Sequence, residues 1–198
     1  MVDNQSNLSE YIHDVVARFP DLVRRWHQER IMLTAGSGLE GAVISLHALN
    51  FGIWHHEDQA RRQDLLDAKV VRHKRRIDKL NAQRNVVVEA IDTHLAELLA
   101  CSGELHSETP AMMIDRLSVL DLRIFHLTES RPAHAALDSK LWVHTLSEQR
   151  KDLTRCLVSL LEDLQSGRKH FRVYRQFKTG FKQYCSLFEG GQEWLQIY

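Results

Sequence analysis

The chain has 198 residues, 43% hydrophobic and 26% charged, which is enough apolar material for one domain with a real core. Lys plus Arg and Asp plus Glu both total 26, and this balance argues against nucleic-acid or anionic-membrane partners. Three widely spaced cysteines without a CxxC arrangement suit free, mostly buried thiols in a reducing cytoplasm. No apolar run approaches the length of a membrane span, and the N-terminus lacks the apolar segment of a signal peptide. We expect a cytoplasmic protein with a single domain over residues 1–198, of which 180–198 form a possible tail.

Few prolines and glycines interrupt the chain, and its abundant Leu, Ala, Glu, Gln, Arg and Lys favour helices throughout. The apolar spacing predicts helical segments at about 9–19, 21–33, 39–62, 70–99, 111–129 and 135–165. Thr109 and Pro110 suit the start of one of these segments, and Gly103 and Gly167 follow the ends of two others. After Gly167 we expect a short helix and then the tail. The predicted fold class is all-α, a bundle of four to six mostly antiparallel helices.

Between Leu46 and Leu99, ionisable and amide side chains lie beside the apolar stripe of each helix instead of opposite it. The first stripe is His47, Asn50, Trp54, Asp58 and Arg61; the second is Lys74, Asp78, Asn81, Asn85 and Asp92, with Arg84 inside the apolar seam. A third stripe, Asp115, Ser118 and His126, follows on the 111–129 segment. Burying such groups without partners costs several kcal/mol. The stripes must therefore satisfy one another, bind water or bind a ligand.

A polar pocket for a phosphate, sugar or carboxylate ligand is our first hypothesis, because packing the three helices together would bring cations, carboxylates and amides to one place. Arg84 and Arg61 are the natural bidentate donors. The candidate ligand-binding residues are Arg61, Lys74, Asp78, Asn81, Arg84, Asn85, Asp115, Arg116 and Ser118. The candidate acid/base residues are His55, Glu57 and Asp58.

The sequence predicts no metal site and no cofactor. His55, His56, Glu57 and Asp58 are metal-ligand types, but consecutive positions point around a helix and cannot all reach one ion. The chain lacks the Glu-x-x-His motif on two helices that is typical of di-iron bundles, the HExxH zinc motif and the G-x-S-x-G elbow. Ser118 could act as a nucleophile only with a base beside it, which the linear sequence does not show.

Two other interpretations stay open. The stripes also fit a non-catalytic structural or interaction protein, in which they are internal struts or the seam of a homodimer. The leucine-rich 135–165 segment and the aromatic residues after 170 support that alternative. The basic and aromatic segment RKHFRVYRQFK would suit RNA, but the zero net charge weighs against a nucleic-acid partner.

From about Leu46 to Lys178 the chain contains, in order, WHHEDQAR, KRRIDKLNAQRN, EAID, ETPAMMIDRLSVL and YRQFK. These motifs resemble a helical bacterial family known as domain-of-unknown-function family 4254. The resemblance falls on the same polar stripes and implies no activity. Its similarity to proteins encoded among surface-polysaccharide genes implies a sugar or nucleotide-sugar context. We therefore expect the pocket to bind an anionic or sugar-like small molecule, and we leave open whether the protein is an enzyme.

Overall fold

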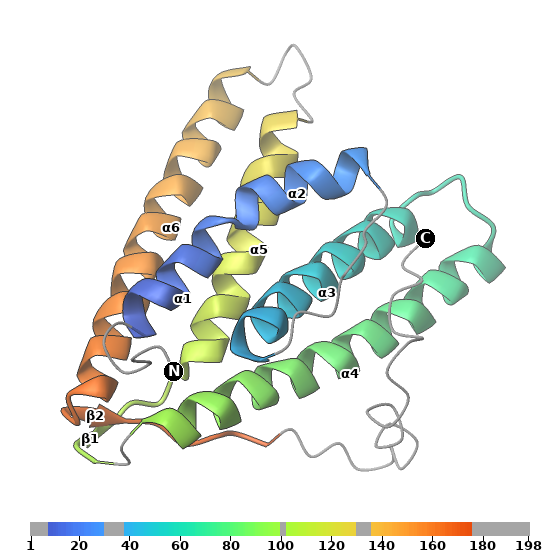
Figure 1. Cartoon of the computed structure of the whole chain (residues 1–198). Coiled ribbons are helices and arrows are strands. Elements are labelled where there is room, and N and C mark those ends of the chain that lie inside the picture. Colours follow the sequence, from blue (N-terminus) through green and yellow to red (C-terminus); the bar gives the residue numbers. More distant parts are fainter. Residues whose placement is uncertain (1–7, 30–37, 100–101, 130–135, 176–198) are drawn as a thin grey trace.

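The computed structural model describes residues 8–29, 38–99, 102–129 and 136–175, except for the side chains of 136–139. These residues form six helices and two very short strands (Figure 1). In chain order they are α1 (Leu8–Ala17), α2 (Phe19–Gln28), α3 (Gly38–Ala60), α4 (Asp67–Leu98), β1 (Glu104–Leu105), α5 (Pro110–Glu129), α6 (Ala136–Gln165) and β2 (Lys169–His170). The all-α fold class is confirmed. The possible tail at 180–198 lies outside the described residues.

Helix α3 lies at the centre of the bundle, with α4 running antiparallel along it and α5 on another side (Figure 1). Helix α6 packs on α5 and α1, and α2 packs on α5. The main core joins α1, α3, α4, α5 and α6 through side chains that include Ile12, Leu46, Ile91, Leu117 and Leu157. None of the helices in the described part of the chain is long and apolar enough to cross a membrane. Among the cysteines, Cys156 is free but exposed, which corrects the expectation of mostly buried thiols for that residue.

The corner between α4 and α5 is fixed by a buried carboxylate of α4. Asp92 accepts a hydrogen bond from the backbone N–H of Ala111 at 2.9 Å and another from the hydroxyl of Thr109. The Thr109 hydroxyl in turn accepts from the N–H of Met112 at 3.3 Å, so its predicted capping role is confirmed. Burial raises the pKa of Asp92 to about 6, although both hydrogen bonds act against the rise. Helices α4 and α5 leave this corner in diverging directions (Figure 1).

The two strands correct the prediction made for the end of the chain. No helix forms over 168–175; instead β2 pairs with β1 in parallel, with Glu104 opposite Lys169. The predicted C-terminal role of Gly167 is confirmed by its φ of +71°. Its N–H bonds to the carbonyl of Leu164, and the next N–H, of Arg168, bonds to that of Asp163. This is the Schellman pattern, which directs the chain out of α6 toward β1.

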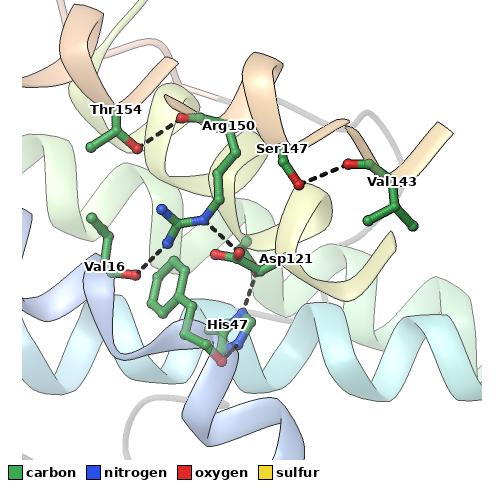
Figure 2. Close-up of polar contacts among 9 residues, drawn as sticks. Val16, His47, Asp121, Val143, Ser147, Arg150 and Thr154 are labelled. Carbon is green, nitrogen blue, oxygen red and sulfur yellow. Dashed lines mark hydrogen bonds and ion pairs between the residues drawn. The ribbon is translucent and has the colours of Figure 1, made fainter. Parts of the chain in front are cut away.

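Arg150 of α6 joins three helices (Figure 2). Its Nε donates to Asp121 of α5 at 2.6 Å, and a terminal nitrogen donates at 3.2 Å to the carbonyl of Val16, in the last turn of α1. The Asp121 side chain is only 3% exposed. Burial raises the pKa of this carboxyl, and the Arg150 guanidinium opposes the rise. The pair therefore holds α6 against α5 and also satisfies a carbonyl that α1 leaves open at its end.

A first prediction compares two glycines with similar backbone and different surroundings. Gly103 and Gly38 have φ values of +86° and +80°, but an added Cβ would lie 2.2 Å from the Arg168 carbonyl oxygen at Gly103 and more than 4 Å from any neighbour at Gly38. We expect Gly38→Ala to lower the free energy of unfolding by about 1 kcal/mol through backbone strain. Gly103→Ala should cost roughly 3 kcal/mol or more. Urea unfolding measures both, and equal losses would contradict the close approach of β1 to β2.

A second prediction concerns the Arg150 pair. Replacing Arg150→Met leaves Asp121 buried without its partner, and we expect a loss of about 3–5 kcal/mol in the free energy of unfolding. The double replacement Arg150→Met with Asp121→Leu removes both charges and should lose clearly less than Arg150→Met alone. Chemical denaturation of the two variants checks this order. A double variant as unstable as the single one would show that the uncompensated charge is not the cause.

Candidate functional site

The polar stripes of α3 and α5 meet in a line of directed hydrogen bonds. His47 Nε2 lies 3.2 Å from the Phe19 carbonyl oxygen, so this nitrogen carries the proton. Nδ1 of the same ring, 2.7 Å from Ser118 Oγ, then accepts the serine hydroxyl. The Asn50 amide donates to Ser118 Oγ at 3.0 Å and to Asp115 Oδ1 at 2.8 Å. The line therefore runs from the start of α2, across α3, to Asp115 on α5.

The base that a nucleophilic serine needs is thus present beside Ser118, a contact that the linear sequence could not show. Both Ser118 and His47 have no exposed surface, and the imidazole stacks on Phe19 with 4.1 Å between ring centroids. Burial lowers the pKa of His47 to about 3, so the ring is a poor proton acceptor at neutral pH. This Ser–His contact therefore positions α3 on α5 and offers no surface to a substrate.

At its outer end the line reaches Arg84 of α4. Arg84 Nε lies 3.9 Å from Asp115 Oδ1, which is close enough for charge attraction and too far for a hydrogen bond. Asn81 and Asn85 are separated by one turn of α4 and flank Arg84. All three α4 side chains are half-buried, and none makes a hydrogen bond to another described residue. We call Asn81, Arg84, Asn85 and Asp115 the Arg84 site.

A second group of predicted residues lies further along α3 and α4. Glu57 accepts a hydrogen bond from Lys74 at 3.0 Å and lies 3.9 Å from Arg61. Lys74 stands ten residues before Arg84, which places it about 15 Å away along the helix axis. The structure therefore brings Glu57, Lys74 and Arg61 together, but apart from the Arg84 site.

The remaining predicted residues do not join either group. His55 contacts the rings of α2 and α5 instead of α4. Asp58 is exposed close to His55, whose pKa it raises slightly against the larger effects of burial and neighbouring histidines. Arg116 pairs with Glu108 at 2.5 Å, and Asp78 is exposed on α4. The roles assigned to these residues stay predictions.

Three histidines that are far apart in the sequence meet where α2, α3 and α5 come together. One ring nitrogen of each of His27, His55 and His126 lies within 4.8 Å of the other two. Aromatic rings surround them: His27 stacks on Phe125 at 4.4 Å and His126 on Trp54 at 4.8 Å between centroids. We call these residues the histidine triad. The linear sequence draws attention to metal-ligand types at 55–58 but does not join these three positions, because isolated histidines on separate helices leave no spacing signal.

The buried imidazole of His47 gives a pH-dependent stability. Its folded pKa of about 3 lies below the unfolded value near 6.5, so the unfolded chain gains a proton as pH falls while the folded chain does not. The contribution of His47 to the free energy of unfolding is therefore present above pH 6.5 and is lost as the pH falls below that value. Between pH 7 and 5 the loss is about 2 kcal/mol. We expect His47→Gln to flatten the profile of unfolding free energy by that amount, and the exposed His94→Gln to leave it unchanged. Parallel profiles for wild type and His47→Gln would contradict this assignment.

Comparison with known proteins gives one match. The model of a family described as "Protein of unknown function (DUF4254)" matches residues 40–173, a range that contains α4, α5, α6 and nearly all of α3. No curated protein and no solved structure matches the chain.

Proposed function

Because the chain belongs to the family of proteins of unknown function DUF4254, whose description names no activity, we propose a function from its own side chains: it binds a small anionic or sugar-like molecule at the Arg84 site. The observation that carries the proposal is the state of Asn81, Arg84 and Asn85. They are half-buried on one face of α4 without a hydrogen bond to any described residue. Polar groups that are partly withdrawn from water and have no hydrogen bond within the protein are available to a ligand.

The donor set of the Arg84 site suits an anion that also carries hydroxyl groups. A guanidinium presents a fork of N–H donors that matches phosphate or carboxylate oxygens. Asn81 and Asn85 each offer both donors and an acceptor, as sugar hydroxyls require. Asp115 is held by Asn50 through one oxygen, and its other oxygen can accept from a hydroxyl. The Arg84 side chain is 30% exposed, so an ion pair formed there is less screened than one on the open surface.

The buried part of the polar line supports this site without being part of it. His47, Ser118 and Asn50 satisfy one another and fix the orientation of Asp115. The inner end of the line therefore fits the alternative interpretation, in which the polar side chains hold the helices together. We propose a ligand site only at the outer end.

The separation of about 15 Å between Lys74 and Arg84 along α4 distinguishes two classes of ligand. A sugar phosphate would need only the Arg84 site, whereas an extended ligand such as a nucleotide sugar is needed to reach Lys74 and Arg61 as well. The resemblance to proteins of surface-polysaccharide gene clusters favours such sugars as probes. Glu57 pairs with Lys74, and His55 lies with His27 and His126, so we propose binding and assign no reaction.

The proposal predicts a ligand-dependent melting temperature. A sugar phosphate or nucleotide sugar at 100 times its Kd should stabilise the wild type by about 2.7 kcal/mol. Arg84→Ala should lose this response. Arg75→Ala, which removes an exposed arginine from the same helix, should keep it. A thermal-shift screen that includes inorganic phosphate and neutral sugars measures both the shift and its chemistry.

Two results would overturn the proposal. The first is a wild type that responds to no probe, which the strut or homodimer interpretation predicts. The second is an equal response from Arg84→Ala and wild type, which would place binding elsewhere. Sedimentation of the wild type with and without ligand then separates a monomeric binding protein from a homodimer whose seam covers the α4 face.

A further inference from the structure

The histidine triad gathers three imidazoles from three separate helices. The centroid of the His27 ring lies 4.9 Å from that of His55 and 5.1 Å from that of His126, and the last two are 5.3 Å apart. One nitrogen of each ring lies within 4.8 Å of the other two. Three imidazole nitrogens gathered at one place form the donor set of many zinc centres.

The ring of His27 has the tautomer that a metal ligand needs. Its Nδ1 lies 2.7 Å from the carbonyl oxygen of Val23, one turn earlier on α2. A carbonyl only accepts, so Nδ1 carries the proton and the lone pair is left on Nε2. Metal-binding histidines are commonly oriented by such a hydrogen bond from the second ring nitrogen to a backbone carbonyl.

The ring of His126 is held in place while one of its nitrogens lacks a partner. Nε2 is buried and has no hydrogen-bond partner within the described part of the chain. The ring lies nearly parallel to Trp54, with an interplanar angle of 6°. Burial, together with the nearby His27, lowers the pKa of His55 and His126 to about 4. The lone pair that a neutral imidazole carries is therefore not used by a hydrogen bond to another described residue at His126 Nε2.

Aromatic packing explains only part of this arrangement. Phe51 and Phe125 contact the triad with centroid separations of 4.4 Å to His55 and to His27, and phenyl rings could fill these places equally well. Packing does not require that three ring nitrogens converge, nor that His126 Nε2 be buried without a partner. Both features are satisfied by a bound cation.

We propose that His27, His55 and His126 bind one divalent transition-metal ion of the zinc type, against the expectation from the sequence that no metal is bound. Imidazole favours Zn²⁺, Cu²⁺, Ni²⁺ and Fe²⁺ over Mg²⁺ and Ca²⁺. Nitrogen ligands of tetrahedral zinc stand about 3.3 Å apart, so the triad nitrogens would close by at most about 1.5 Å. Asp58, three residues after His55 and exposed beside it, is placed to hold a water in the fourth position.

The metal site is independent of the Arg84 site. His126 and Asp115 are eleven residues apart on α5, or about 16 Å along its axis. Failure of one proposal therefore leaves the other standing, because the variants that test them share no residue.

Zinc titration of the full chain, after chelator treatment and dialysis at pH 7.5, tests the proposal. We expect one Zn²⁺ per chain by calorimetry and the absorption bands of tetrahedral Co²⁺ when cobalt replaces zinc. His27→Gln, His55→Gln and His126→Gln should each weaken binding at least tenfold. His73→Gln is the matched control: His73 also contacts a histidine, with its Nδ1 2.9 Å from that of His56, but it lies outside the triad. This variant should bind like the wild type.

The variant His126→Phe separates metal binding from packing, because a phenyl ring can still stack on Trp54. Zn²⁺ should raise the melting temperature of the wild type and leave that of His126→Phe unchanged. Absence of stoichiometric zinc binding by the wild type would overturn the proposal. Equal weakening by His73→Gln and the triad variants, or retained zinc stabilisation in His126→Phe, would also overturn it.

Discussion

The buried ion pair between Arg150 and Asp121 is the constraint on which the orientation of α5 depends. Asp121 is the last of three polar residues spaced three apart on α5, after Asp115 and Ser118. A step of three residues turns the helix by somewhat less than a full circle, so each side chain meets a different neighbour. Asp115 faces Arg84 on α4, Ser118 faces α3, and Asp121 faces α6. Fixing Asp121, which Figure 2 shows beside Arg150, therefore also fixes where Asp115 lies about two turns earlier on the same helix.

The two candidate sites share only α5 and suit opposite chemistry. The Arg84 site is charged and partly open, and its charges are only loosely paired, which suits an anion or a hydroxyl-rich molecule. The histidine triad brings three imidazole nitrogens within 4.8 Å of one another beside aromatic rings, which suits a cation that accepts lone pairs. The difference arises from the side chains themselves: guanidinium and amide groups donate hydrogen bonds to an anion or a hydroxyl, whereas a neutral imidazole nitrogen offers a lone pair to a metal ion.

Apolar spacing predicted the helices well, since each one has a buried stripe. The polar stripes of α3 and α5 do meet, at Asn50, Asp115 and Ser118, although the sequence did not single out this contact. Contacts that depend on packing could not be predicted. Strands β1 and β2 have two residues each, too few for any periodicity. Leu141 follows the leucine pattern of α6 yet is 61% exposed, which the pattern alone does not indicate. The triad depends on where α2 crosses α3 and α5, which no linear pattern encodes.

The two candidate sites also differ in whether all of their residues lie within the segment that the family model matches. Every residue of the Arg84 site, and the His47, Asn50 and Ser118 side chains behind it, lie within residues 40–173. His27 lies on α2, before that range, while His55 and His126 lie within it. A helical bundle that begins at α3 would therefore contain the whole Arg84 site but only two of the three imidazoles. Two histidines bind zinc much less firmly than three, so the metal site depends on the packing of α2 against the matched segment. The proposed anion site thus lies wholly within the segment that the family model matches, whereas the proposed zinc site also needs a residue of this chain outside that segment.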